Sequence, residues 1–218
     1  FRVENITTKP TKRSPAPPFT TSTLQQEAAR KLGFSVSQTM LIAQHLYESG
    51  KITYMRTDSV NLSDFALKAA EAEITNMLGK KYWKLRHYVT KTKGAQEAHE
   101  AIRPTQIEVK EPKGLDTKEE KLYQMIWKRA LATQAAAAKL ESNSIDLLNK
   151  EALFRARGLR VVFDGFYRIY GEKHDDQILP EIKVGEKLPA QKVSLIETET
   201  TPMPRYSDAS LVASLEKQ

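Results

Sequence analysis

The sequence predicts an α+β fold in which a helical domain is inserted into a β-rich domain. Residues 14–140 contain helical patterns of apolar side chains that end at glycines, whereas residues 141–200 are rich in β-branched and aromatic side chains. Residues 1–13 open with alternating apolar and polar side chains, which is typical of a strand. We therefore expect a discontinuous β-rich domain of residues 1–13 and 141–200, a helical domain of residues 14–140, and the first helix of a further domain in residues 201–218.

Composition narrows the class of protein. The 218 residues are enough for one or two domains with a real core, and 34 Lys and Arg against 27 Asp and Glu give a formal charge of +7. A basic excess favours a polyanionic partner. The chain has no cysteine, which excludes disulfides and thiolate metal sites and is consistent with a cytoplasmic location. No apolar run approaches the ~20 residues of a membrane span, so we expect no membrane partner.

Four helices are expected in the first two thirds of the chain. Residues 9–18 contain four prolines, which favour an extended linker and a domain boundary. Each helix is opened by a capping side chain, and the first three close near a glycine. The helices are expected at residues 24–32, from Ser35 or Ser37 to Glu48, from Asn61 or Ser63 to Leu78, and from Thr117 to about Leu140. Capping boxes of Thr23 with Gln26 and of Thr117 with Glu120 begin the first and the last, and Leu41 and Tyr47 belong to the apolar face of the second.

After Asn143 the pattern changes from helix to strand. Strands are expected at residues 144–149, 152–157, 159–170 and 191–197, with turns at Gly158 and Gly171. Residues 80–94, which precede the fourth helix, interleave basic and aromatic side chains. That pattern suits single-stranded nucleic acid, and it also suits a loop whose rings fill the core.

The segment Gly50 to Ser59 is the strongest candidate for chemistry. Tyr54 and Arg56 are two residues apart, so in an extended backbone their side chains leave on the same face. A phenol beside a guanidinium is suited to attack on a phosphodiester, with the phenol as nucleophile and the cation holding the developing charge. The alternative is a buried strand tyrosine next to a solvated arginine.

Four segments, in order, resemble motifs of the bacterial type IA DNA topoisomerase family. They are Pro18 to Gln26 (PFTTSTLQQ), Thr53 to Ser59 (TYMRTDS), Glu97 to Thr105 (EAHEAIRPT) and Pro204 to Val212 (PRYSDASLV). In that family a β-rich arch carries the helical domain with the active-site tyrosine. The resemblance thus implies that the chain is the central part of such an enzyme, with both domains.

The resemblance implies an ATP-independent transesterification that relaxes negatively supercoiled DNA. A tyrosine attacks a phosphorus of single-stranded DNA, becomes linked to the 5′ phosphate, and later gives the phosphate back to the 3′ hydroxyl. By motif position, the catalytic residues are expected to be Tyr54, Arg56 and His99, the DNA-binding residues Lys51, Thr57 and Arg103, and the supporting residues Asp58 and Ser59. Asp58 could orient His99 or Arg56, but the residue types of Asp58 and Ser59 favour caps of the next helix.

The family uses Mg²⁺, and the resemblance places its acidic ligands in a domain that precedes Phe1. No carboxylate spacing in this chain replaces them, so we expect no metal ligands here and an inactive isolated fragment. The expected partners are single-stranded or negatively supercoiled DNA, the preceding metal-binding domain and the domain that follows, in a bacterial cytoplasm. Two alternatives stay open: a non-catalytic nucleic-acid-binding module with a helix-turn-helix-like helical part, in which Tyr54 belongs to the core, and a structural hinge domain.

Overall fold

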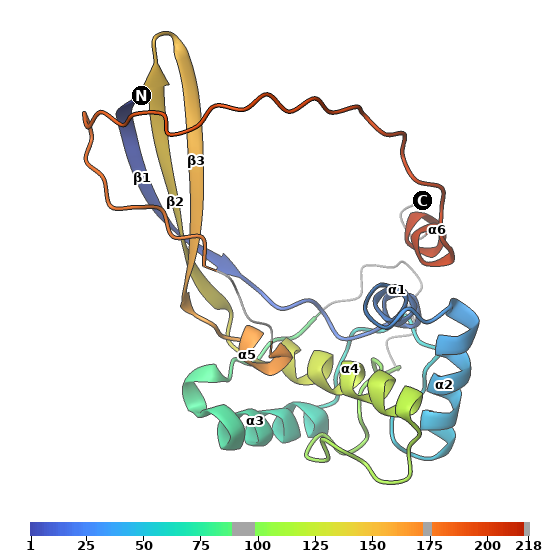
Figure 1. Ribbon diagram of the computed structural model, residues 1–218. Coiled ribbons are helices and arrows are strands. Elements are labelled where there is room, and N and C mark those ends of the chain that lie inside the picture. Colours follow the sequence, from blue (N-terminus) through green and yellow to red (C-terminus); the bar gives the residue numbers. More distant parts are fainter. Residues whose placement is uncertain (89–98, 172–175, 216–218) are drawn as a thin grey trace. The chain divides into compact units, whose positions relative to one another are not determined.

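The computed structural model describes residues 1–88, 99–171 and 176–215 (Figure 1). The chain divides into two compact units. The sheet unit consists of Phe1–Ser14, Ala137–Gly165 and Gly171–Pro204, and the helical unit consists of Pro15–Ala136, Phe166–Tyr170 and Arg205–Gln218. The long segment of the helical unit therefore lies, along the chain, between two segments of the sheet unit. Helices and an antiparallel sheet together make the fold α+β.

The helical unit is organised around its longest helix, α4. Its helices are α1 (Thr21–Leu32), α2 (Val36–Glu48), α3 (Asp64–Leu78), the 3₁₀ turn η1 (Lys80–Tyr82), α4 (Thr117–Thr133), α5 (Tyr167–Tyr170) and α6 (Asp208–Leu215). Helix α4 contacts α1, α2, α3 and α5. Its Trp127 is 1% exposed and donates its indole N–H to the carbonyl of Ile107 at 2.7 Å, so the largest core side chain is also hydrogen-bonded.

Helix α1 starts earlier than the sequence predicted, and α4 starts at the predicted Thr117 but has a different cap. Helix α1 is capped by Thr20, which forms a capping box with Thr23. The Thr20 hydroxyl accepts the Thr23 N–H, and the Thr23 hydroxyl accepts the Thr20 N–H. Helix α4 is likewise capped by Asp116 with Glu119. In both places several hydroxyl or carboxylate residues follow one another, so the pattern identifies a helix start without fixing which residue is the cap.

Helix α4 ends at Thr133, whereas the alanine-rich sequence predicted that it continues to about Leu140. Arg86 and Tyr88 both donate to the carbonyl of Thr133, at 3.0 and 3.2 Å, and Gln134 exchanges hydrogen bonds with the backbone of Arg86. These partners replace the next helical turn. The described part of residues 80–94 therefore packs against the end of α4, with Tyr82 buried, while residues 89–94 lie outside the described residues.

The sheet unit is a three-stranded antiparallel sheet in the order β1 (Arg2–Arg13), β2 (Ala138–Asn149) and β3 (Ala152–Phe163) (Figure 1). Residues 9–13 belong to β1 and are not the predicted linker, and Pro10 faces Glu141 of β2. Proline is tolerated there because β1 is at the edge of this sheet, where its lost N–H breaks no second ladder. The turn between β2 and β3 contains Lys150, with φ of 54°. β3 runs unbroken from Ala152 to Phe163, so the predicted turn at Gly158 is wrong.

Gly158 lies inside β3 because another segment crosses the strand there. A Cβ at this position would come within 2.5 Å of the Gln177 carbonyl oxygen and 2.8 Å of Leu179 Cγ. Next to it, the backbones of Leu159 and Gln177 exchange two hydrogen bonds of 3.0 Å. The glycine thus permits close approach of residues 177–179.

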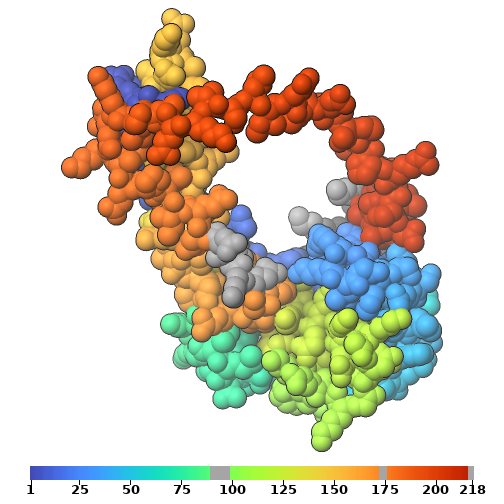
Figure 2. Space-filling model, in the orientation of Figure 1, coloured from blue at the N-terminus to red at the C-terminus, as the bar shows by residue number. Residues whose placement is uncertain are grey.

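The last two predicted strands differ from the structure. β3 ends at Phe163, and Tyr167–Tyr170 form the short helix α5. Residues 191–197 alternate in sequence but form no strand, and residues 189–208 are all exposed. Figure 2 shows residues 190–204 as a single file of residues. Alternation alone does not make a strand when no neighbouring strand accepts its backbone hydrogen bonds.

Among the helices of the described residues, none is long and apolar enough to cross a bilayer.

Candidate active site

The Tyr54 segment forms a loop between α2 and α3 in which buried and exposed side chains alternate. Met55, Thr57 and Ser59 are buried, whereas Tyr54, Arg56 and Asp58 are exposed. Tyr54 keeps 46% of its surface exposed. The phenol and the guanidinium are therefore on the solvent side of the same short segment, which is the arrangement that their spacing predicted.

On one side this loop pairs with the His99 segment. The backbones of Ile52 and Pro104 form an antiparallel bridge, and the Thr53 N–H donates to the Arg103 carbonyl at 2.9 Å. The Thr53 hydroxyl also donates to the carbonyl of Ala101 at 2.7 Å. His99 is exposed and lies two residues before Ala101, so backbone pairing brings its segment alongside the loop that carries Tyr54. Glu97 and Ala98 of the same motif lie outside the described residues.

On the other side the loop is held by the first residue of α1. The Thr21 hydroxyl donates to the Met55 carbonyl at 2.8 Å and accepts the Thr57 N–H at 2.8 Å, and the Thr21 N–H donates to the Thr57 carbonyl. Phe19 and Ile102 then pair with each other. Two segments that are far from the loop in sequence, the start of α1 and the segment after His99, thus hold the backbone on both sides of Tyr54.

Arg103, one of the three predicted DNA-binding residues, is 7% exposed and bound within the protein. Its Nε and Nη2 donate to the two carboxylate oxygens of Glu100 at 2.7 and 2.8 Å, and its Nη1 donates to the Pro104 carbonyl. Glu100 also accepts the N–H of Ser63, the N-cap of α3, at 2.7 Å. Burial raises the pKa of Glu100, but the bonds from Arg103 and Ser63 outweigh it, so this pKa lies below its ordinary value.

The remaining predicted residues divide between surface and interior. Lys51 is half-buried, whereas Thr57 is buried and accepts the Ser59 N–H at 3.0 Å. Ser59 in turn accepts the Asn61 N–H at 3.1 Å. The predicted capping role of Asp58 and Ser59 is wrong because Ser63 caps α3. The two residues precede the helix by too many positions for their oxygens to cap its first turn.

Sequence reasoning missed Tyr47. It was assigned to the apolar face of α2, yet it is 42% exposed, and Leu41 is 58% exposed. The ring of Tyr47 meets that of Tyr54 edge to face, with centroids 5.2 Å apart and planes at 66°. The only signal in the sequence is that Tyr47 is the last aromatic residue before the glycine that ends α2.

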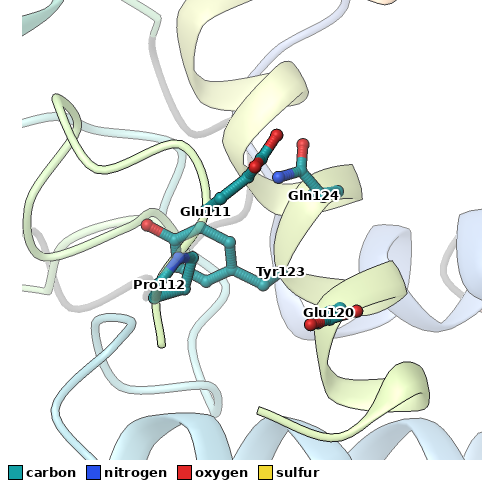
Figure 3. A pocket seen from close by; sticks show the side chains of 5 residues that line it. All are labelled: Glu111, Pro112, Glu120, Tyr123 and Gln124. Atoms are coloured by element: carbon teal, nitrogen blue, oxygen red, sulfur yellow. The ribbon is translucent and has the colours of Figure 1, made fainter. Parts of the chain in front are cut away.

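One pocket in the described part of the helical unit is acidic and therefore does not suit a phosphate. It holds about 260 Å³ between the loop before α4 and α4 itself, and its lining is Glu111, Pro112, Glu120, Tyr123 and Gln124 (Figure 3). Its carboxylates repel phosphate. Burial, with Glu108 nearby, raises the pKa of Tyr123 to about 12, and this phenol donates to the Val109 carbonyl. The candidate site is therefore the exposed Tyr54 face.

The described residues do not fit a magnesium site. No three His, Asp or Glu side chains gather within residues 1–88, 99–171 and 176–215. Near Tyr54, the carboxylate of Glu100 is occupied by Arg103 and Ser63. Mg²⁺ requires several free oxygen ligands, and the described residues around Tyr54 do not bring such a set together.

Comparison with known proteins agrees with the arrangement of the motifs. A family model described as DNA topoisomerase matches residues 1–218. DNA topoisomerase 1 of Synechocystis sp. is 49% identical over 231 residues, which cover 100% of this chain and 26% of that protein. DNA topoisomerase 1 of Campylobacter jejuni is 44% identical over 229 residues, covering 99% of this chain and 33% of that protein.

A solved structure also matches. Full-length topoisomerase I from Thermotoga maritima superposes with a TM-score of 0.82 and 38% identity over 99% of this chain and 37% of that one. Fold and motifs together define a DNA topoisomerase of type IA. The chain belongs to the bacterial DNA topoisomerase I family, and it spans about a quarter to a third of the length of these relatives.

Proposed function

We propose that this chain carries the nucleophile of a bacterial type IA topoisomerase and that Tyr54 is that nucleophile. One observation supports this assignment most directly. Tyr54 is 46% exposed on a loop that two other sequence motifs hold, one on each side, and Arg56 is exposed from the same loop. A nucleophile must reach a phosphate, and a fixed backbone keeps it in an orientation suitable for attack.

The proposed step exchanges one phosphodiester for another. The Tyr54 oxygen forms a bond to a backbone phosphorus of single-stranded DNA, the bond from phosphorus to the 3′ oxygen breaks, and that oxygen takes up a proton as the phenol loses one. The enzyme is left on the 5′ phosphate. Religation reverses the step and needs no ATP because the bond energy is kept in the phosphotyrosine. Between the two steps, passage of a strand relaxes negative supercoils.

Arg56 and His99 are proposed to assist that step. Arg56 binds a non-bridging oxygen of the phosphate and stabilises the charge that develops in the transition state. His99, exposed on the paired segment, hydrogen-bonds the phosphate or relays a proton. The Mg²⁺ of the family is proposed to be held by residues outside this chain, in the cytoplasmic enzyme of which the chain is a part. The isolated chain is then expected to form no adduct.

The exposure of Tyr54 also separates this proposal from the main alternative. In a non-catalytic binding module, the tyrosine would serve the core, as Tyr82 and Tyr123 do at 8% and 2% exposure. Tyr54 has several times their exposed fraction. A hinge domain likewise gives no reason for a phenol and a guanidinium to be exposed together.

The test uses the full-length enzyme with end-labelled single-stranded DNA and a denaturing quench. Tyr54→Phe deletes one oxygen and keeps the ring, so covalent attachment should disappear while folding and most DNA binding remain. Arg56→Ala should lower the cleavage rate by about a hundredfold and the affinity much less, because the cation acts on the transition state. The control is Tyr206→Phe, at a tyrosine that is 70% exposed. Retained attachment in Tyr54→Phe would refute the assignment.

A further inference from the structure

Tyr47 occupies a position that the proposed reaction does not yet use. It is exposed, comes from the last turn of α2, and its ring lies edge to face against the ring of Tyr54 at 5.2 Å. We propose that Tyr47 is a positioning residue that holds the Tyr54 ring in the orientation needed for attack on the phosphate. This inference rests on the proposed role of Tyr54 as nucleophile.

The backbone of Tyr47 is also fixed by its neighbours. The preceding residue, Leu46, is 0% exposed and anchors the end of α2 in the core. The carbonyls of Leu46 and Tyr47 accept the N–H groups of Lys51 and Gly50, both at 2.8 Å, and Gly50 has φ of 68°, which ends the helix. The ring of Tyr47 therefore extends from a fixed helix end.

The ring of Tyr54 needs such a contact because the bonds that hold its backbone do not hold the ring. Hydrogen bonds fix the backbone around it at Thr53, Met55 and Thr57, but they leave rotation about the bonds of the Tyr54 side chain open. An edge-to-face contact between rings restricts that rotation while 46% of Tyr54 remains exposed for a phosphate. Restricting the attacking group lowers the entropic part of the barrier.

The experiment separates chemistry from binding in the full-length enzyme. Single-turnover cleavage of end-labelled single-stranded DNA is measured at saturating enzyme, and DNA affinity is measured separately. Tyr47→Ala should slow cleavage by about threefold to tenfold with unchanged affinity, because one aromatic contact is lost. Tyr47→Phe keeps the ring and should cleave at nearly the normal rate. Leu41→Ala, at an exposed residue of the same helix, should change neither quantity.

Three results would overturn the inference. The first is a normal cleavage rate in Tyr47→Ala, the second is a loss of affinity in Tyr47→Ala with normal cleavage once DNA is bound, and the third is a Tyr47→Phe enzyme as slow as Tyr47→Ala. The second result would indicate contact with a DNA base, and the third a role for the hydroxyl. Melting temperatures of the variants show whether each is folded. The proposed function fails separately, if the adduct still forms in Tyr54→Phe.

Discussion

At the scale of single residues, the Arg103–Glu100 pair shows how hydrogen bonds stabilise the segment beside the candidate site. Arg103 was predicted to contact DNA from its place in the motif, but the structure uses its guanidinium for the two oxygens of Glu100 and for the Pro104 carbonyl. Glu100 joins this pair to the start of α3 through the Ser63 N–H. The pair therefore ties the His99 segment to the helix that follows the Tyr54 loop.

Glu100 should make the stability of the chain depend on pH in the acid range. Its folded pKa is lowered from 4.5, so its contribution is complete above pH 4.5 and is lost as pH falls through the lower folded value. Glu100→Gln should destabilise the chain by about 2 kcal/mol at pH 7, because bonds to a charged partner are weakened. Urea unfolding should show this difference shrinking below pH 4.5. A difference that stays constant with pH would contradict the prediction.

At the scale of elements, the attachment of α1 to the Tyr54 loop rests on one hydroxyl. Thr21→Val keeps the shape of the side chain but removes the bond to the Met55 carbonyl and the acceptor for the Thr57 N–H. It should destabilise the chain by about 2 kcal/mol and slow cleavage in the full-length enzyme. Thr21→Ser keeps the hydroxyl and should behave as wild type in thermal melting and in cleavage. Equal effects of the two substitutions would contradict the proposal that the Thr21 hydroxyl attaches α1 to the Tyr54 loop.

The elements also show how far sequence reasoning reaches. Local signals marked the end of α1 at Gly33 and narrowed two helix starts to a pair of residues each, of which Ser35 and Ser63 are the caps, because capping depends on neighbouring residues. The sequence did not reveal that Arg86 ends α4 or that residues 177–179 cross β3 at Gly158. Both depend on partners more than 15 residues away in the chain.

The same limit applies to the candidate site. Spacing alone placed Tyr54 and Arg56 on one face, since alternation is a local property of an extended backbone, but it left open whether that face is buried or exposed. Spacing could not reveal Tyr47, because its contact with Tyr54 depends on how α2 ends. Nor could it separate the exposed Arg56 from the buried Arg103, since both are arginines within short polar motifs.

At the scale of the whole molecule, the two units offer different candidate surfaces for DNA. The helical unit exposes Arg56 beside Tyr54, and the sheet unit exposes arginines such as Arg157 on β3. If the proposed function is right, the surface around Tyr54 contacts the phosphates. Affinity of the chain for single-stranded DNA should then fall steeply as salt rises, because each phosphate contact releases counterions.

Salt titrations of two matched variants locate that surface. Plotting the logarithm of the affinity against the logarithm of the salt concentration gives a slope of about −0.7 for each phosphate contact on single strands. Arg56→Ala should make this slope shallower by about 0.7, since one contact is lost, whereas Arg157→Ala should leave it unchanged. Fluorescence anisotropy with a labelled oligonucleotide measures both. The reverse outcome would move the DNA-binding face to the sheet unit, and affinity that does not change with salt would exclude phosphate contacts from both units.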